Sequence, residues 1–187
     1  MELDLGLGDK YDILLPKIQR IGGIEYPINL WTIEETNSQL AYLTHGFVRY
    51  YGKFPSTVAG QLLQQYPAPH NGILIDNFSG SGTSLVEAAR RGIKSIGIDI
   101  NPVAVLAGKV KTRVYNIAKL RRDIDLINAQ LNKDLQSIQV SIPNDDYLHK
   151  WFFQESISEI VRLKQTILSL KEEIDADFFA LAFFSII

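Results

Sequence analysis

The sequence predicts an α/β fold organised around a parallel, doubly wound unit. Residues 72–76 (GILID) and 94–98 (KSIGI) are two short apolar runs, each followed by or ending in an acid, and a glycine-rich turn and an amphipathic helical segment separate them. This order of strand, turn, helix and strand is the unit from which doubly wound sheets are built, with a right-handed crossover. The 187 residues, 46% hydrophobic and 21% charged, suffice for one domain. Its expected parts are residues 1–44, 45–112 and 113–187.

The first part is expected to hold a hairpin and a helix. Residues 13–21 and 24–30 flank Gly22 and Gly23, which can take the positive φ angles of a two-residue hairpin turn. A helix is expected to start near Thr32, because the two acids that follow suit a positive helix N-terminus.

The second part is expected to open with a loop and then alternate helices and strands. Residues 50–55 are predicted as the loop, and Ser56 is expected to cap a helix that runs to about Tyr66 before two prolines end it. A helix over residues 83–91 is predicted to stop at Gly92. The side chains expected to face inward from it are Leu85, Val86, Ala88 and Ala89.

The third part is predicted to be mostly helical. The expected helices cover residues 102–111, 116–135, 147–170 and 174–187, with one short strand over residues 138–142. Residues 178–187 (FFALAFFSII) are nearly all apolar, and a helix that is apolar all round must be buried. We therefore expect this segment either to mediate self-association or to cover the open face of the sheet.

Composition excludes several classes of site and of protein. There is no cysteine, which excludes a disulfide scaffold, a thiolate metal site and a cysteine nucleophile. The three histidines are far apart and lack metal-ligand spacing, so no metal site is expected. No apolar run is long enough to span a membrane, and the start lacks a signal-peptide pattern. The expected compartment is the cytoplasm, without membrane partners.

Positive charge is concentrated in one segment, although the net charge is only −2. Residues 88–122 contain nine lysines and arginines against one acid, Asp99. Such a segment indicates either a surface for a polyanion or a set of solvated helix faces, and the sequence leaves both interpretations open.

The turn from Asp76 to Thr83 (DNFSGSGT) has the features of a ligand loop. Glycines after a strand let a ligand approach the backbone, and the start of the next helix offers free N–H groups. The dinucleotide fingerprint would need a third glycine where Leu85 stands, and a nucleotide-binding P-loop would need Gly-Lys-Ser/Thr. Asp99, at the end of the second strand, is placed to accept hydrogen bonds from ribose hydroxyls. Together these features predict a site for an adenosine-containing ligand.

Two strings in this order carry a resemblance to a known family. One is D-x-F-x-G-S-G-T from Asp76, followed by VEAARRG and GIDINP; the other is Thr44-His45-Gly46 with RYYGKFP over residues 49–55. They resemble the S-adenosyl-L-methionine site of the amino-group DNA methyltransferases, the restriction–modification methylases that modify N6 of adenine or N4 of cytosine. The resemblance covers about residues 31–112. It implies a Rossmann-like class I methyltransferase sheet, here truncated, that binds S-adenosyl-L-methionine and serves a DNA-modifying enzyme.

The resemblance also implies cofactor-binding roles for particular residues. Those implied for the methionyl end are Asp76, Phe78, Gly80, Gly82 and Thr83; for the ribose, Asp99; for the adenine, Ile100 and Pro102; and for closing the site, Phe54, Pro55 and Ser56.

The catalytic half of the family pattern is absent from the sequence. The family places Asp/Asn/Ser-Pro-Pro-Tyr/Phe against the target amine, and the 187 residues contain no Pro-Pro pair. We therefore expect no catalytic residue in this chain, and a missing C-terminal half or a second chain that carries the motif. Two alternatives stay open: a fragment of an RNA guanine methyltransferase, which shares the glycine-rich string, and a non-catalytic S-adenosylmethionine-binding or partner subunit.

Overall fold

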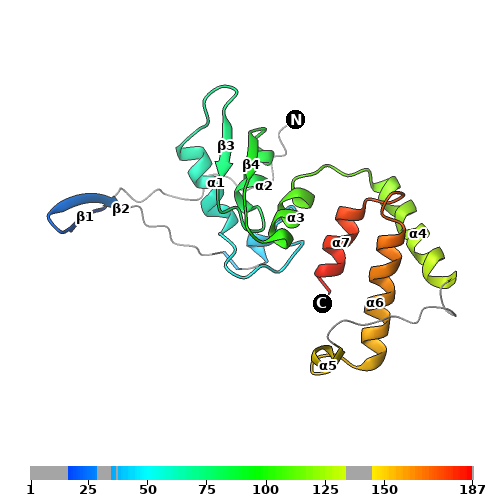
Figure 1. Cartoon of the computed structure of the whole chain (residues 1–187). Coiled ribbons are helices and arrows are strands. Elements are labelled where there is room, and N and C mark those ends of the chain that lie inside the picture. Colours follow the sequence, from blue (N-terminus) through cyan, green and yellow to red (C-terminus); the bar gives the residue numbers. More distant parts are fainter. Residues whose placement is uncertain (1–16, 29–34, 37, 134–144, 187) are drawn as a thin grey trace. The chain divides into compact units, whose positions relative to one another are not determined.

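The structure is a computed structural model that describes residues 17–28, 35–36, 38–133 and 145–186. The chain divides into two compact units, residues 1–39 and 40–187, which we describe separately (Figure 1). Within the described residues, no helix is both long and apolar enough to cross a membrane.

The first unit contains the predicted hairpin. Strands β1 (Lys17–Ile21) and β2 (Ile24–Ile28) pair antiparallel, and Gly22 and Gly23 between them have φ angles of 58° and 84°. Positive φ at both positions is the requirement of the tight turn that follows the twist of a hairpin. The hairpin is thus confirmed from residue 17 to residue 28, and the rest of its predicted length lies outside the described residues.

The described residues after Thr32 do not form the α-helix that was predicted to start there. Residues 29–34 lie outside them, Gln39–Ala41 form a short 3-10 helix (η1), and turns follow up to residue 48. The Gln39 side chain accepts hydrogen bonds from both the backbone N–H and the hydroxyl of Thr36, each at 2.9 Å. Such local side-chain bonds compete with helix formation, so the prediction of an α-helix is wrong here.

The predicted strand–turn–helix–strand unit is present in the second unit. Strands β3 (Ile73–Asp76) and β4 (Lys94–Gly97) pair in parallel, and helix α2 (Thr83–Arg90) connects them. Helices α1 (Ser56–Gln65) and α3 (Pro102–Lys111) precede and follow this unit. The described part of the sheet therefore has two strands. Because they run in parallel, their C-terminal ends lie at the same edge of the sheet.

The start of α3 confirms its prediction, whereas the predicted cap of α1 is wrong. Pro102 occupies the first turn of α3, and the Asn101 side chain caps it by accepting from the Val103 N–H at 3.0 Å. In α1, Pro55 holds the N-cap position, and Ser56 is the first helical residue. The predicted Ser56 cap is wrong because the Ser56 hydroxyl donates to the Leu40 carbonyl instead, at 2.8 Å.

Helix α2 covers only one face of the two strands. Its Leu85, Val86 and Ala88 are buried as predicted, whereas Ala89 is exposed and Glu87 is buried in its place. A Cβ on Gly97 would lie 2.5 Å from the Leu85 side chain, so β4 and α2 are in close contact.

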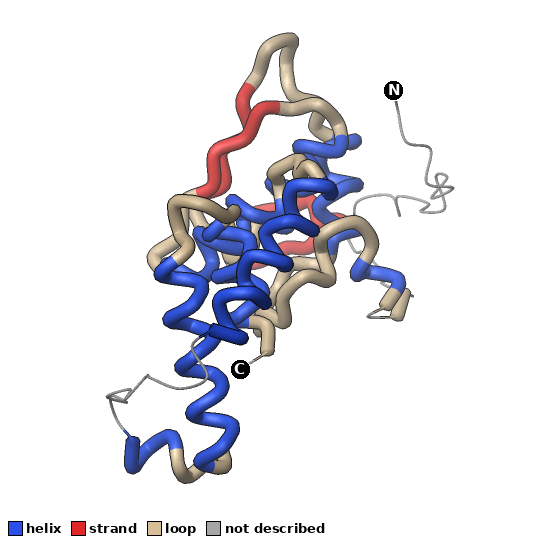
Figure 2. The backbone as a smooth tube through the Cα atoms, turned by 90° about the vertical axis from the view of Figure 1, so that its right-hand side faces the viewer, coloured by secondary structure: helices blue, strands red, loops and turns tan. Residues whose placement is uncertain are grey.

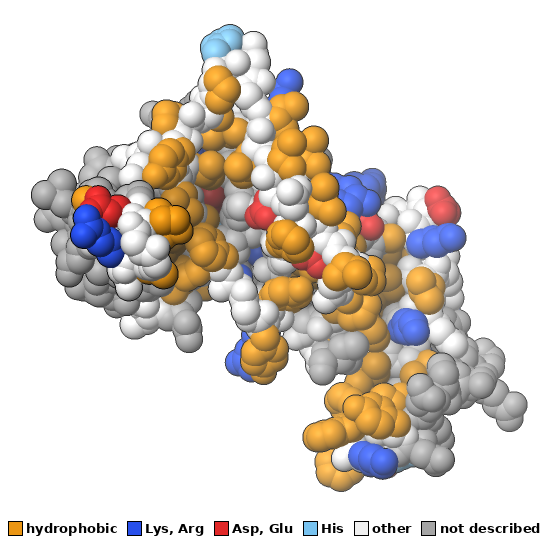
Figure 3. Space-filling model, turned by 60° about the vertical axis from the view of Figure 1, so that its left-hand side comes forward, with side chains coloured by type: hydrophobic (Ala, Val, Ile, Leu, Met, Phe, Trp, Pro, Cys, Tyr) orange, Lys and Arg blue, Asp and Glu red, His pale blue; other side chains and the backbone are white. Residues whose placement is uncertain are grey.

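The other face of the sheet carries isoleucines that nothing in the described chain covers. Their exposed fractions lie between 49% and 60%. These residues are Ile73, Ile75, Ile96 and Ile98. Figure 3 draws exposed hydrophobic side chains in orange. Parallel sheets are ordinarily buried on both faces, so this exposed apolar face is unusual for a parallel sheet.

The chain beyond α3 is helical where it is described (Figure 2). Its helices are α4 (Ile117–Lys133), α5 (Asp145–Leu148), α6 (Gln154–Ser169) and α7 (Ala176–Phe184). The single helix predicted over residues 147–170 is wrong, because a turn after Leu148 separates α5 from α6 and Phe153 is extended at the start of α6. The strand predicted over residues 138–142 lies outside the described residues.

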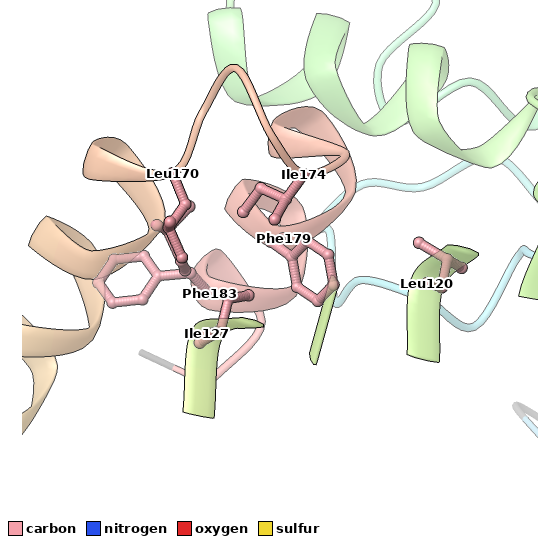
Figure 4. Close-up of a cluster of buried hydrophobic side chains, with 7 residues drawn as sticks. Leu120, Ile127, Leu170, Ile174, Phe179 and Phe183 are labelled. Carbon is pink, nitrogen blue, oxygen red and sulfur yellow. The ribbon is translucent and has the colours of Figure 1, made fainter. Parts of the chain in front are cut away.

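Helix α7 is the centre of the helical core. Its Phe179 and Phe183 pack with Leu120 and Ile127 of α4 and with residues of and after α6 (Figure 4). Its Leu181 packs on the opposite side against α3. Phe179, Leu181 and Phe183 are therefore buried among helices, while Phe184 and Ile186 stay exposed. The expectation that the segment covers the sheet is wrong.

Candidate functional site

The glycine-rich turn begins with a carboxylate that organises it. Asp76 ends β3; its Oδ1 accepts from the Phe78 N–H at 3.1 Å, and its Oδ2 accepts from the Ser84 hydroxyl. Asp76 thereby links the start of the turn to the first turn of α2. The side chain of Phe78 points to solvent and is almost fully exposed.

The two glycines of the turn have left-handed backbone conformations, which residues with a side chain adopt only under strain. Gly80 has φ of 49°, and Gly82, at the N-cap of α2, has φ of 80°. A Cβ on Gly82 would lie 2.8 Å from the Cα of Gly108. Gly82 is therefore required both for the turn and for the close approach of α2 to α3.

Asp99 ties the turn to the end of the second strand. Its Oδ2 accepts from the Gly80 N–H at 2.8 Å, and its Oδ1 accepts from the Asn101 N–H at 2.9 Å. A carboxylate offers about four acceptor positions, so capacity for ligand hydroxyls remains. Next to it, Ile100 is fully exposed and Pro102 is exposed at the start of α3.

A pocket of about 440 Å³ lies between the turn and the segment that precedes α1. This volume falls within the usual range of small-molecule sites. It brings together five of the residues predicted to bind a cofactor: Phe54, Asp76, Phe78, Gly80 and Thr83. The other six lie outside its lining: Pro55, Ser56, Gly82, Asp99, Ile100 and Pro102.

Three polar residues near the turn were not singled out from the sequence. Lys53 and Ser81 line the pocket, and Lys111 donates from its buried ammonium to the Ser81 carbonyl at 2.7 Å. Burial, and then repulsion by Lys53, lower the pKa of Lys111 to about 8. Lys53 lies in the GKFP string, and that position is the one signal that could have identified it.

Glu87 of α2 is a fully buried carboxylate that connects its helix with the turns before α1 and, through Arg91, with α1 itself. Its Oε1 accepts from the Tyr42 hydroxyl at 2.5 Å and lies 3.1 Å from His45 Nε2, while its Oε2 accepts from Arg91 at 2.5 Å. Arg91 also donates to the carbonyl of Gly60 in α1, at 2.9 Å. Burial would raise the pKa of Glu87, but the hydrogen bonds from His45, Tyr42 and Arg91 outweigh it and lower the pKa to about 2. The network holds the His45 segment and α1 against α2.

Several of the basic side chains of residues 88–122 form ion pairs with carboxylates of the same chain. Lys109 pairs with Asp177 at 2.5 Å, and Lys119 pairs with the buried Asp123 at 2.6 Å. Arg113 lies 3.3 Å from a carboxylate oxygen of Asp175. The pairs of Lys109 and Arg113 link α3 and the residue that follows its C-cap to the start of α7, and the pair of Lys119 lies within α4. These three pairs favour a structural role for part of the segment.

Comparison with known proteins agrees with the arrangement of strand, turn, helix and acid. A family model described as a DNA methylase, of the N6/N4 type, matches residues 19–109. Over this region the chain is similar to the amino-group DNA methylases. The matched region contains most of the hairpin, the pocket and all eleven predicted cofactor-binding residues. The family resemblance found in the sequence is confirmed.

Curated methylases are similar to parts of the chain. The Type II methyltransferase M.MjaII of Methanocaldococcus jannaschii is 42% identical over 88 residues, which are 45% of this chain and 16% of M.MjaII. M.BsoBI of Geobacillus stearothermophilus is 35% identical over 80 residues, 42% of this chain and 16% of its own length. M.MvaI of Kocuria varians is 29% identical over 170 residues, 81% of this chain and 37% of M.MvaI.

The chain therefore spans well under half of the length of these methylases. No solved structure matches it.

Proposed function

We propose that this chain is the cofactor-binding portion of a DNA methyltransferase that transfers methyl groups from S-adenosyl-L-methionine to N6 of adenine or N4 of cytosine. One observation carries the proposal. Gly80 and Asp99, from the ends of two parallel strands, are joined by a 2.8 Å hydrogen bond beside a pocket of about 440 Å³. Ligands of open α/β sheets bind at this edge, outside the carboxyl ends of the strands.

The residues present fit the three parts of this cofactor. Asp76 is half-buried at the pocket wall and suits the methionyl amine. Asp99 has acceptor capacity left for the ribose hydroxyls, and the exposed Ile100 offers an apolar surface for the adenine. Phe54 of the preceding loop faces the pocket from the opposite side. When bound, S-adenosyl-L-methionine supplies the electrophilic methyl group.

The group that aligns the target amine is proposed to come from polypeptide outside this sequence. The 187 residues contain no Pro-Pro pair, so the family's target-binding motif is absent from them. The uncovered isoleucines of the sheet favour the same view, because further structure would bury them. We propose DNA as the substrate of the complete enzyme and the cytoplasm as its compartment.

A second candidate function is a non-catalytic subunit that binds the cofactor or a partner. The missing motif is the observation that favours it for this sequence. Both candidates require the cofactor site, and they differ in whether a complementing chain yields methyl transfer. The RNA guanine methyltransferase alternative is not favoured, since the family match is to DNA methylases.

Calorimetric titration with S-adenosylhomocysteine, the demethylated product, tests the proposed site. We expect saturable binding to the chain and a loss of more than about tenfold in affinity in Asp99→Ala, because a hydrogen bond to a carboxylate contributes about 1.5–3 kcal/mol. Asp99→Asn, which keeps one acceptor, should lose less. Asp125→Ala, on the exposed face of α4, is the matched control. Equal affinities for Asp99→Ala and the parent, at equal melting temperatures, would remove Asp99 from the site.

A further inference from the structure

The hairpin of β1 and β2 exposes the side chains of both its faces. Residues 18–26 are all exposed, and the sheet contains these two strands alone among the described residues (Figure 1). Four of the exposed side chains are large and apolar, with exposed fractions between 44% and 69%: Ile18, Ile21, Ile24 and Tyr26. A hairpin of two strands is marginally stable in water, and more strands with an apolar face make it stable. A further strand would therefore stabilise this hairpin.

The turn of the hairpin determines the direction of its backbone groups. Gly22 and Gly23, with φ angles of 58° and 84°, have the shape of a type I′ turn. The residues that flank such a turn, Ile21 and Ile24, form a hydrogen-bonded pair, and along the ladder these pairs alternate with pairs that are not hydrogen-bonded. Two pairs are of the second kind, and their N–H and C=O groups point away from the other strand of the hairpin. These pairs are Arg20 with Glu25 and Ile18 with Pro27.

The two outer edges of the hairpin differ. On the β2 edge, Pro27 has no N–H, and proline is one of the devices that prevent an edge from pairing. On the β1 edge, Ile18 and Arg20 each offer an outward N–H and an outward C=O. A charged side chain also hinders edge pairing, but the Arg20 guanidinium is bound to the Glu25 carboxylate at 3.0 and 2.7 Å. The edge of β1 is therefore the one open to a further strand.

We propose that this chain self-associates through the edge of β1, which pairs antiparallel with β1 of a second copy. With Gln19 of each copy facing the other across a twofold axis, Ile18 of one copy forms a hydrogen-bonded pair with Arg20 of the second copy. The outward N–H and C=O groups of both residues are then satisfied by the same two residues of the second copy. The edge is thus complementary to itself, as a twofold interface requires.

The side chains agree with this register. Arg20 lies opposite an apolar side chain and not opposite a second arginine, and like charges directly opposite each other would be destabilising. Gln19 lies opposite itself, and its amide can both donate and accept a hydrogen bond. Ile21, Ile24 and Tyr26 share a face of the hairpin with Gln19, so the sheet of four strands carries one enlarged apolar face. The inference is independent of the cofactor site.

Opposite charges at position 19 test the register by sedimentation of the full chain. We expect a parent dimer that dissociates on dilution. Gln19→Lys and Gln19→Glu should each raise the dimer dissociation constant by about fivefold or more, because two like charges would then face each other. An equimolar mixture of the two variants should restore the dimer. Gln154→Lys and Gln154→Glu, at an exposed glutamine at the start of α6, are the matched controls and should leave the constant unchanged.

Amide hydrogen exchange gives a second readout at the edge itself. The amides of Ile18 and Arg20 should be protected at concentrations where the dimer forms and should lose this protection on dilution. The amide of Glu25, which points outward from β2, should exchange at either concentration. Ile18→Pro should raise the dissociation constant by about tenfold or more, because it removes an edge donor from each copy and no donor of the β1–β2 ladder.

Three results would overturn the inference. They are a parent chain that is monomeric at every concentration, a dimer that the charged variants and their mixture leave unchanged, and protection of Ile18 and Arg20 that does not depend on concentration. In the last case the edge would be covered within one chain. None of these results bears on the cofactor site, so the proposed function stands or falls by its own titration.

Discussion

Glu87 has no exposed surface, yet it is charged, because Tyr42, His45 and Arg91 all donate to it. Removing one partner of a buried charged network typically costs 3–5 kcal/mol. We expect Glu87→Gln to lower the free energy of unfolding by about 3 kcal/mol at pH 7, as measured by urea denaturation.

The same side chain predicts a pH dependence on the acid side. Its folded-state pKa, about 2, is below the ordinary value of 4.5, so its contribution is complete above pH 4.5 and is lost as the pH falls toward 2. The difference in stability between parent and Glu87→Gln should therefore shrink between pH 5 and pH 3. Glu159→Gln, on the exposed face of α6, is the control. A difference that stays constant over this range would contradict the assigned charge state.

Lys111 predicts a second pH dependence, on the alkaline side. Its folded-state pKa of about 8 is below the ordinary 10.5, so between these values the unfolded chain binds more protons and stability rises with pH. In urea denaturation at pH 8 and pH 10, the parent should gain stability relative to Lys111→Met. A parallel pH dependence of the two proteins would show that the ammonium is not buried.

At the scale of single residues, the sequence predicts those positions that a short local motif defines. Asp76, Gly80 and Asp99 were identified because their spacing along the strand–turn–helix–strand unit is itself the signal. Glu87 stands in the same motif, but its burial depends on Tyr42 and His45, more than 40 residues away. Sequence periodicity instead placed its neighbour Ala89 inside.

At the scale of elements, the contact between α2 and α3 depends on one glycine. Gly82 has a positive φ, and a Cβ added to it would lie 2.8 Å from the Cα of Gly108. Gly92 also has a positive φ, 67°, but open space around it. We expect Gly92→Ala to cost about 1 kcal/mol from backbone strain alone, and Gly82→Ala to cost more, about 2–3 kcal/mol, in urea denaturation. Equal costs would mean that α2 and α3 can separate without loss.

Helix α7 offers a matched pair of phenylalanines. Phe183 is buried in the helical core, whereas its neighbour Phe184 is 43% exposed. Phe183→Ala should lower the free energy of unfolding by about 3–5 kcal/mol, and Phe184→Ala by less than about 1 kcal/mol.

The same pair tests the predicted self-association through residues 178–187. If Phe184→Ala shifts the sedimentation of the chain from dimer to monomer, the exposed side of α7 is an interface. If both proteins sediment as monomers, that prediction is wrong.

The bounds of the helices show which of their features the sequence predicts and which it does not. Helix α3 was predicted with its observed bounds because Asn101-Pro102 is a strong start signal. The break between α5 and α6 contains neither glycine nor proline, so the apolar pattern continued through it. The packing of α7 against α3 and α4 depends on contacts distant in sequence, which periodicity does not describe.

The parallel sheet of the described residues has two strands, and one of its faces is exposed. Four isoleucines are exposed on one face, and no Pro-Pro pair occurs in the sequence. Alignment of the reacting groups supplies a large part of an enzymatic rate enhancement. We therefore predict that residues 1–187 alone transfer no labelled methyl group from S-adenosyl-L-methionine to DNA. Transfer above a no-protein control would contradict the account of the missing motif.

We propose that the turn between β3 and α2, together with Asp99, binds S-adenosyl-L-methionine. A nuclear magnetic resonance titration of the isotope-labelled chain with S-adenosylhomocysteine tests this binding directly. We expect saturable shifts concentrated at the backbone amides of Phe78, Gly80 and Asn101, with the amides of α4 and α6 unchanged. Signals of the turn that stay in place at saturating ligand, or shifts confined to the helical region, would contradict it.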